Sequence, residues 1–372
     1  MAKAKNSCVN VKTTLLAAGA SWPLEQTSGS CLHGTCHLRP SCREPRCEVL
    51  STCVRETLTW LSSFMLLLSM KFDQGRSEWI FGSQDDCFCW RVVDIVNKGL
   101  GVVARRTIHR GERIMAESPL AVCSKQNGHL HDEHINAVVK VLAPVARAAF
   151  YQLSQAAQVH GTCKTAPGIW RSNAYPKGPP EGRVEQAVYP GICRLNHSCV
   201  PNTHNAWSEV LGQQTIHAMH RISEGEEITV SYLTPGLERH RRQQHLRSRF
   251  GFECTCALCS LAGASRDASD TRQRRIAAID GALSAGSEAR RALGAQITSL
   301  VTEKLRLLRE EGMPETWGHV DMVYAFSQSC AEGDLAAADH WMRHAIKAAR
   351  RGLGSDSKVV LDAERIGCFS DA

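Results

Sequence analysis

The chain carries the run Arg194-Leu195-Asn196-His197-Ser198-Cys199-Val200-Pro201-Asn202, which places an amide, an imidazole and a thiol close together. Two further runs follow, Glu227-Ile228-Thr229-Val230-Ser231-Tyr232 and Cys254-Thr255-Cys256-Ala257-Leu258-Cys259. The second alternates like a strand and ends on a phenol, and the third has the spacing of a metal-binding knuckle. Polar, phenolic and thiolate groups in this order indicate an enzyme.

In that order the three runs resemble the SET-domain protein lysine methyltransferases, in particular the SET-MYND branch and its fungal relatives that lack the MYND finger. The resemblance covers residues 89–262. It implies an α+β fold, in which a multi-stranded SET-type β domain carries a helical insertion and a C-terminal (post-SET) zinc knuckle. It also implies methyl transfer from S-adenosylmethionine to a protein lysine, histone or non-histone. Because a fold does not fix a function, a catalytically weak SET-fold protein-binding scaffold is the alternative.

The composition is that of a globular protein that is large enough for two domains and an appendage. Of its 372 residues 43% are hydrophobic, and 44 Lys and Arg against 37 Asp and Glu give a net charge of +7, which permits but does not require an acidic partner. The 17 cysteines are odd in number and unevenly spaced, and no secretory signal is evident. Reduced thiols and bound metal are therefore favoured over a disulfide scaffold.

One apolar run, residues 60–70, is too short to cross a bilayer, which requires about 20 apolar residues. We therefore expect a soluble protein of the nucleus, the cytoplasm or both, without a membrane partner.

Residues 1–88 differ from the rest of the chain. Their cysteines lie among Arg, Pro and Ser without strand or helix periodicity, at Cys31, Cys36, Cys42, Cys47 and Cys53. None of these forms a C-x2-C pair, so a disordered extension is favoured over a zinc module to which His33 and His37 would add ligands. Non-coding sequence translated in error would give the same pattern.

Short strands separated by glycine turns begin near residue 90 and indicate a small, bent β domain. We expect strands at 91–95, 102–104 and 114–117, with turns at 99–101 and 110–112. An inserted helical segment at about 125–185 follows, on the helical spacing of Ile135, Val138, Val139, Leu142, Val145 and Phe150.

Residues 263–372 have a helical pattern throughout. One stripe ends at Gly312 and Pro314 and consists of Leu293, Ile297, Leu300, Val301, Leu305 and Leu308. Gly333-Asp334 is expected to cap another helix. Paired helices with small residues at their crossings resemble a degenerate tetratricopeptide (TPR-like) array, which could bind a protein partner.

Methyl transfer requires a sulfonium donor held in line with a deprotonated lysine. The resemblance implies that Asn196 and His197 contact the polar edges of S-adenosylmethionine. It also implies that the backbone of the turn Lys98-Gly99-Leu100-Gly101 lies close to this cofactor, which glycine permits. Phe252 would pack near the adenine. Without the resemblance, Asn196 and His197 would be interpreted as turn caps, 99–101 as a plain hairpin turn and Phe252 as a core residue.

Tyr232 is the candidate catalytic residue. Its phenol should share a strand face with Ile228 and Val230, and in relatives it borders the methyl donor and the acceptor nitrogen. A phenol with a pKa of about 10 is a poor base at neutral pH, so it would orient the amine, while desolvation near the sulfonium would deprotonate the lysine. A structural tyrosine is the alternative. Whether Tyr189 also lines the pocket is left open by the sequence.

The knuckle supplies three thiolates, from Cys254, Cys256 and Cys259, whereas tetrahedral zinc takes four ligands. The resemblance gives Cys199 as the fourth. Such a zinc ion would be structural and would order the active site.

A basic run, Arg239-His240-Arg241-Arg242, is not interleaved with aromatic residues. A solvated helix face is therefore favoured over direct nucleic-acid binding. The expected partners are a protein substrate that presents a lysine, with histones among the candidates, and a protein that binds the helical tail.

Overall fold

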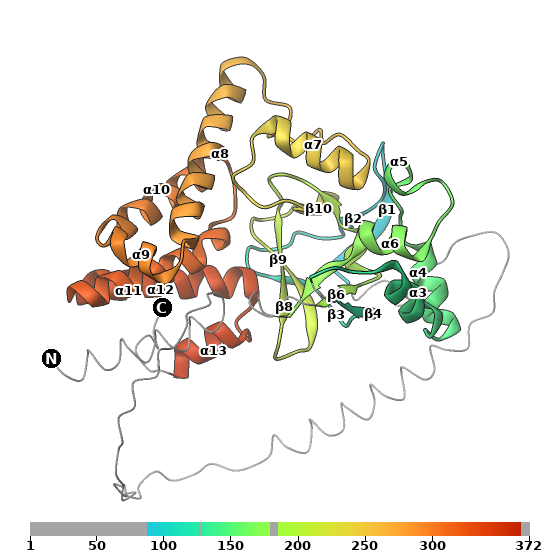
Figure 1. Cartoon of the computed structure of the whole chain (residues 1–372), viewed down its shortest axis with the longest axis horizontal. Helices are drawn as coiled ribbons and strands as arrows, with labels where there is room; N and C mark the ends of the chain where they lie inside the picture. Colours follow the sequence, from blue (N-terminus) through green and yellow to red (C-terminus); the bar gives the residue numbers. More distant parts are fainter. Residues whose placement is uncertain (1–87, 126–127, 179–184, 366–372) are drawn as a thin grey trace, which may run out of the picture. The chain divides into compact units, whose positions relative to one another are not determined.

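The computed structural model describes residues 88–125, 128–178 and 185–365 (Figure 1). The cysteine-rich extension lies outside these residues, so the interpretations of 1–87 stay predictions. None of the described helices is both long and apolar enough to cross a membrane.

Three small sheets form the β part of the chain. The first has the order β1-β2-β10-β7, with bounds Trp90–Ile95, Gly99–Ala104, Glu227–Val230 and Asn196–His197. The second has the order β3-β9-β8, with bounds Arg113–Glu117, Gln213–Ala218 and Thr203–Ser208. The third has the order β4-β6-β5, with bounds Ala121–Ser124, Glu185–Val188 and Tyr175–Lys177.

The β1–β2 connection is a tight hairpin turn at residues 96–98. The turn expected at 99–101 was therefore wrong, because the chain turns just before these residues. Asn97 and Gly99 both have left-handed backbone, with φ of 60° and 71°, and Ile95 pairs directly with Gly99. Asparagine tolerates this conformation better than other residues with a side chain, which lets the chain reverse before the glycines. Residues 99–101 therefore belong to β2.

Strand β10 joins distant parts of the chain. It pairs antiparallel with β2 and parallel with β7, where Thr229 faces Asn196 and Val230 faces His197. Asn202 fixes this arrangement, because its Oδ1 accepts from the Thr229 N–H at 2.9 Å and its Nδ2 donates to the Glu227 carbonyl at 2.9 Å. The 194–202 run and the strand before Tyr232 are thereby held side by side.

The helical insertion lies between β4 and β5. It contains α3, α4, α5 and α6, with bounds Asp132–Lys140, Pro144–Gln152, Ala157–His160 and Ala166–Asn173. Ile135, Val139, Phe150 and Trp170 are buried in its own core. Val145, expected on the same apolar stripe, is exposed, because Pro144 begins a separate helix and changes the face. Sheets together with these helices confirm the α+β class.

The remaining helices follow the β part. They are α7, α8, α9, α10, α11, α12 and α13, with bounds Arg239–Phe250, Gly263–Ser284, Ser287–Leu293, Gln296–Glu310, His319–Glu332, Leu335–Leu353 and Lys358–Arg365. Short 3-10 turns, η2 and η3, cover Ile192–Arg194 and Glu315–Gly318. The expected stripe from Leu293 to Leu308 spans two helices rather than one, because Gly294, with φ of 48°, ends α9. Asp334 caps α12 as expected, since its Oδ1 accepts from the Ala337 N–H at 2.9 Å.

Helices α11 and α12 form an antiparallel pair, and α12 also packs against β8 and β9 (Figure 1). Arg113 of β3 reinforces this contact, since its guanidinium pairs with Asp356 and its Nε donates to Nε2 of His217 at 3.2 Å. The helical tail is thus built directly onto the second sheet. Its assignment as a tetratricopeptide-type array, like the domain boundaries, stays a prediction.

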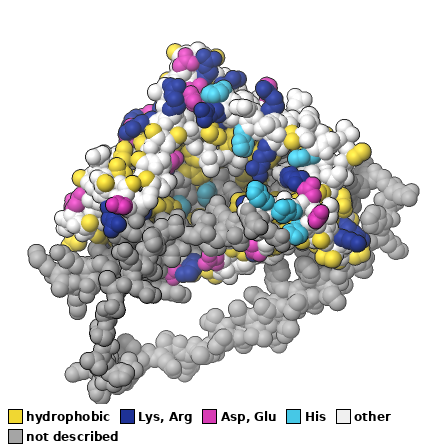
Figure 2. Space-filling model, in the orientation of Figure 1, with side chains coloured by type: hydrophobic (Ala, Val, Ile, Leu, Met, Phe, Trp, Pro, Cys, Tyr) yellow, Lys and Arg dark blue, Asp and Glu magenta, His cyan; other side chains and the backbone are white. Residues whose placement is uncertain are grey.

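The basic helix α7 has acidic and carbonyl partners along its length. Arg247 pairs with Glu253, and Arg239 donates to the Cys259 carbonyl at 2.7 Å. Figure 2 shows acidic side chains among the basic ones on the side of the molecule in view. A solvated helix face agrees with this distribution, and the expectation against nucleic-acid binding stays a prediction.

Candidate active site and metal centre

Glu227 connects two of the predicted cofactor segments. Its Oε2 accepts from Lys98 Nζ at 2.6 Å, and its Oε1 accepts from Asn196 Nδ2 at 2.9 Å. A Cβ on Gly101 would lie 2.6 Å from both Asn196 Nδ2 and Ile95 Cγ1, so only glycine allows this approach. The structure therefore brings together the β1–β2 hairpin and Asn196, through a carboxylate that sequence reasoning missed.

The signal for Glu227 was present in the sequence. It is the first residue of the Glu227–Val230 strand, but only the apolar alternation of that run was interpreted. Leu100 lies between the two glycines in β2 and pairs with Asp94 across the hairpin. Gly99 is exposed and a Cβ there would meet nothing within 4 Å, which leaves open space beside the turn.

Asn196 is only partly buried, and its amide presents two different groups. The nitrogen is committed to Glu227, whereas no hydrogen bond to Oδ1 is found among the described residues. An amide oxygen with two lone pairs in this position can accept from an ammonium or hydroxyl group of a ligand.

The imidazole of His197 is buried, with 6% exposure, and both of its nitrogens have protein partners. Nδ1 accepts from the Tyr232 N–H at 3.0 Å, and Nε2 lies 3.2 Å from Cys199 Sγ. Burial lowers the pKa of His197 to about 4, so the ring is neutral. Since the ring is used internally, a cofactor contact at His197 would fall to its backbone.

Tyr232 lies beyond the end of β10 instead of within the strand, because β10 stops at Val230. Its Oη donates to the buried Leu195 carbonyl at 2.8 Å, which fixes the direction of the phenol. Burial, followed by the nearby Cys193 and Glu227, raises the pKa of Tyr232 above its usual range. A phenol that stays protonated and donates to a carbonyl can still accept at its oxygen, but it cannot act as a general base at neutral pH.

Aromatic rings surround Tyr232. Phe250 lies 4.8 Å from it and Phe252 6.4 Å, between ring centroids. Phe252 also lies 6.1 Å from the His197 ring. The predicted adenine neighbour Phe252 is therefore adjacent to the candidate catalytic residue, in an apolar wall of partly buried rings.

Two further tyrosines form a layer near this wall. Tyr175, from β5 of the insertion, meets Tyr189 edge to face with centroids 6.2 Å apart. Tyr189 is fully buried, and its hydroxyl has no hydrogen-bond partner among the described residues. Burial raises the pKa of both phenols. Complete enclosure gives Tyr189 a packing role, whereas the partly exposed Tyr175 had no sequence motif to reveal it.

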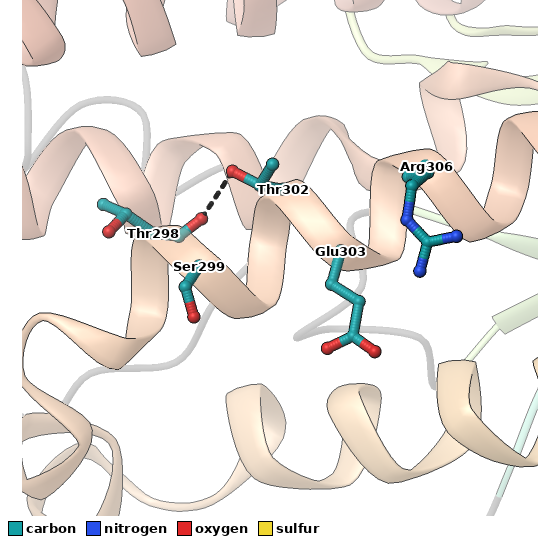
Figure 3. Close-up of a pocket in the computed structure, with 5 residues that line it drawn as sticks. All are labelled: Thr298, Ser299, Thr302, Glu303 and Arg306. Carbon is teal, nitrogen blue, oxygen red and sulfur yellow. Dashed lines mark hydrogen bonds between the residues drawn. The ribbon is translucent and has the colours of Figure 1, made fainter.

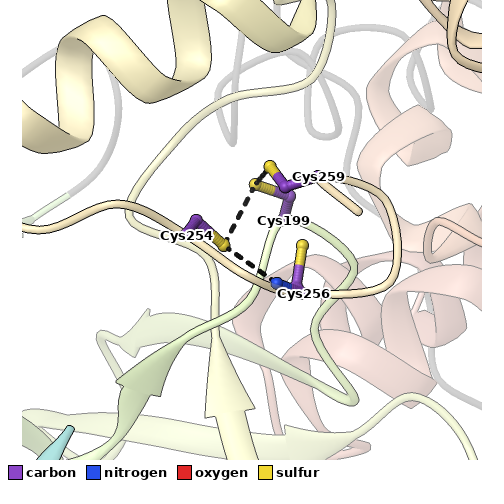
Figure 4. Close-up of side chains that lie close together, drawn as sticks. All are labelled: Cys199, Cys254, Cys256 and Cys259. Carbon is purple, nitrogen blue, oxygen red and sulfur yellow. Dashed lines mark hydrogen bonds between the residues drawn. The ribbon is translucent and has the colours of Figure 1, made fainter. Parts of the chain in front are cut away.

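The four predicted zinc ligands come together. The sulfur atoms of Cys199, Cys254, Cys256 and Cys259 all lie within 4.8 Å of one another (Figure 4). Cys199 Sγ is 3.5 Å from that of Cys259 and 3.9 Å from that of Cys254. Zn–S bonds of 2.3 Å in a tetrahedron place the sulfurs about 3.8 Å apart. The cluster therefore fits zinc in chemistry and in size.

Hydrogen bonds among the four thiols shift their pKa values in opposite directions. The hydrogen bond with Cys199 is the largest cause that lowers the pKa of Cys256 and of Cys259, the latter to about 7, whereas the pKa of Cys199 and that of Cys254 are raised. Arg242, 3% exposed, lies against the cluster. Burial alone would lower the pKa of its guanidinium, but a hydrogen bond to Cys259 and the cysteine charges raise it. A buried cation in this place would offset the negative charge of a zinc–thiolate centre.

An open depression of about 480 Å³ lies elsewhere, on the surface of α10 (Figure 3). It is lined by one face of that helix, at Thr298, Ser299, Thr302, Glu303 and Arg306. Thr302 donates to the Thr298 carbonyl at 2.8 Å and Glu303 pairs with Arg275. No predicted site residue borders it, so we do not take it as the functional site.

Comparison with known proteins places these residues in a family. The SET domain matches residues 99–233, a span that contains Asn196, His197, Cys199 and Tyr232. The "Histone-lysine N-methyltransferase set5" of Schizosaccharomyces pombe is 30% identical over 278 residues, which are 73% of this chain and 81% of that protein. The chain belongs to the SET-domain family of protein-lysine methyltransferases.

Members of the SMYD group match this SET domain over shorter segments. The "Protein-lysine N-methyltransferase SMYD4" of Homo sapiens is 39% identical over 82 residues, 21% of this chain and 10% of that protein. The "Histone-lysine N-methyltransferase SMYD3" of Mus musculus is 34% identical over 76 residues, 20% of this chain and 17% of that protein. The predicted family and the predicted enzyme class, lysine methylation, are confirmed by these relationships.

Proposed function

We propose that this SET domain uses S-adenosylmethionine to methylate a histone lysine. The observation that supports the proposal is the meeting of Asn196, the β1–β2 hairpin and Tyr232 around strand β10. The relative from Schizosaccharomyces pombe, named as a histone-lysine methyltransferase, is similar over most of its length and favours histones over other substrates.

The cofactor would lie against the β1–β2 hairpin and Asn196. When bound, S-adenosylmethionine supplies a methyl group activated by a sulfonium. Asn196 Oδ1 would accept from its ammonium group, and the Lys98–Glu227 pair would hold the hairpin in place. The backbone at Gly99 and Gly101 would approach the donor closely, and Phe252 would cover the adenine.

Tyr232 would orient the acceptor nitrogen. Its hydroxyl donates to Leu195, so the remaining lone pairs of Oη can face the polarised methyl group and the amine. The rings of Phe250 and Tyr175 would pack on the aliphatic stem of the lysine. Desolvation of the lysine beside the cationic sulfonium disfavours the ammonium form, so the lysine would release its proton to water before the transfer.

Zinc would be held by Cys199, Cys254, Cys256 and Cys259 in a closed structural site. The chain between Tyr232 and Phe252 would then be anchored at both ends. Tyr232 bonds to His197, which lies two residues before Cys199, and Phe252 lies two residues before Cys254. The metal would order the site without taking part in the reaction.

Helices α11 and α12, which pack as an antiparallel pair, support a proposed TPR-like surface for a protein partner. The alternative function, a catalytically weak SET scaffold, would rely on that surface alone. The two differ in whether cofactor binding is accompanied by turnover.

The first test is calorimetric titration of S-adenosylmethionine into the zinc-loaded full chain. Asn196→Ala should lose affinity, because the accepting oxygen is removed, while Tyr232→Phe should still bind. Asn205→Ala on β8 and the exposed Tyr151→Phe on α4 are matched controls that should bind like wild type. If wild type does not bind, the methyltransferase proposal fails.

The second test is transfer of a labelled methyl group to core histones, with lysozyme as a lysine-containing control protein. Incorporation into one histone, lowered about a hundredfold in Tyr232→Phe and kept in Tyr151→Phe, supports the proposal. Cofactor binding without labelling of histones or of any protein in a cell extract supports the scaffold instead. Labelling confined to other proteins refutes the histone assignment alone.

A further inference from the structure

The ring of His197 has a defined tautomer. The backbone N–H of Tyr232 lies 3.0 Å from Nδ1, and because an amide N–H can only donate, Nδ1 must be the acceptor. Nδ1 therefore carries no proton, and the N–H of the ring is on Nε2. Since Nε2 lies 3.2 Å from Cys199 Sγ, its N–H donates to that sulfur.

This ring contacts both the cysteine cluster and the candidate catalytic tyrosine. It is enclosed between Tyr232 and Phe252, with centroid distances of 5.1 Å and 6.1 Å. The parallel pairing of His197 with Val230 fixes its backbone on the other side. Its packing leaves it little freedom to turn, so both hydrogen bonds are made together or lost together.

We propose that His197 is a positioning residue that couples the metal centre to the backbone of Tyr232. The inference rests on the proposed zinc site. A donated N–H stabilises a metal-bound thiolate by spreading its negative charge, as outer-shell partners of metal ligands do. The same ring, through Nδ1, fixes the chain just after β10 and thus the place from which the Tyr232 phenol reaches the Leu195 carbonyl.

Two amide substitutions separate the two hydrogen bonds. Asparagine places its amide at the level of Nδ1 and can still accept from Tyr232, but it does not reach the sulfur. Glutamine places its amide at the level of Nε2 and can still donate to Cys199, but it offers no acceptor to Tyr232. His197→Asn and His197→Gln are therefore matched controls for each other.

Zinc affinity is measured by competition with a chromophoric chelator, and protection of the Tyr232 amide by hydrogen exchange. Both measurements use the full-length chain. His197→Asn should weaken zinc binding by roughly tenfold to a hundredfold and keep the Tyr232 amide protected. His197→Gln should bind zinc like wild type and lose that protection.

Equal losses of zinc affinity in both variants, or no loss in either, would overturn the proposal, since the donor to Cys199 would then not matter. If wild type holds no metal, the zinc site itself is refuted, and this inference with it. If zinc binds but the variants do not differ, only the role of His197 is refuted.

A measurement on wild type serves if both variants fail to fold. Protein loaded with an NMR-active cadmium isotope should show scalar coupling between the metal and the His197 ring proton, transmitted through the hydrogen bond to Cys199. A ring proton on Nδ1, or a proton on Nε2 without coupling, contradicts the assigned tautomer and overturns the proposal.

Discussion

Removing one hydroxyl from Tyr232 and from Tyr189 should change the stability of the protein in opposite directions. The Tyr232 hydroxyl donates to the buried Leu195 carbonyl at 2.8 Å. Tyr232→Phe leaves that acceptor without a partner, which costs about 1–3 kcal/mol. The Tyr189 hydroxyl is buried without a partner among the described residues, so Tyr189→Phe removes a desolvation cost of about 1–3 kcal/mol.

The two free energies of unfolding should therefore differ by at least about 2 kcal/mol, although the chemical change is the same. For a protein of this size that corresponds to melting temperatures about 3 °C or more apart. Scanning calorimetry of the zinc-loaded variants measures the difference directly. In methyl-transfer assays Tyr232→Phe should lower kcat by about a hundredfold, whereas Tyr189→Phe should keep wild-type kcat.

A Tyr189→Phe variant that melts as far below wild type as Tyr232→Phe would refute this reasoning. It would show that the Tyr189 hydroxyl has a stabilising partner and that its enclosure is not a cost. Equal loss of kcat in both variants would likewise contradict the packing role of Tyr189.

The β1–β2 hairpin, the His217 imidazole and the thiolate cluster each give a further prediction. Gly101→Ala, whose Cβ would lie 2.6 Å from two heavy atoms, should abolish calorimetric cofactor binding, whereas Gly212→Ala in the β8–β9 turn, where φ is 63° and a Cβ would meet nothing within 4 Å, should retain it and lose about 1–2 kcal/mol of stability to backbone strain. Burial and Arg113 lower the pKa of His217 to about 4, below the usual 6.5, so the unfolded chain protonates first and stability falls as pH drops from 6.5 to 4. The whole loss is about 3 kcal/mol, and urea unfolding at pH 7 and pH 5 should show part of it. In His217→Gln the free energy of unfolding should depend less steeply on pH. Cys259→Ser should reduce the bound zinc measured by mass spectrometry. Cys163→Ser, at an exposed cysteine, should leave the bound zinc unchanged.

The sequence predicted features whose cause is local. The knuckle cysteines are close along the chain, so the short loop between them can adopt few arrangements and the structure gathers them. Asp334 caps α12 because capping needs only the next turn of the same helix. The 110–112 turn before β3 was likewise expected from its glycine.

Expectations failed where a local pattern had more than one solution. Asparagine and glycine both tolerate left-handed backbone, so the local sequence allows a reversal at Asn97 or at the glycines. The pairing of β1 with β2 selects the register in which the chain reverses at Asn97. Tyr232 lies beyond the strand that the alternation assigned to it, because its backbone N–H donates to Nδ1 of His197 instead of to a neighbouring strand.

By itself the sequence determined the enzyme class and the α+β fold, because three runs in one order resemble a single family, and it predicted the residues for the cofactor and the metal. Only the tertiary structure decided that Glu227 joins Lys98 to Asn196, that Tyr175 reaches the aromatic layer, and that His197 directs one nitrogen to a sulfur and the other to Tyr232. These contacts depend on the parallel pairing of β7 with β10 and on the return of the insertion at β5. Residues so distant along the chain leave no periodicity or spacing that could predict them.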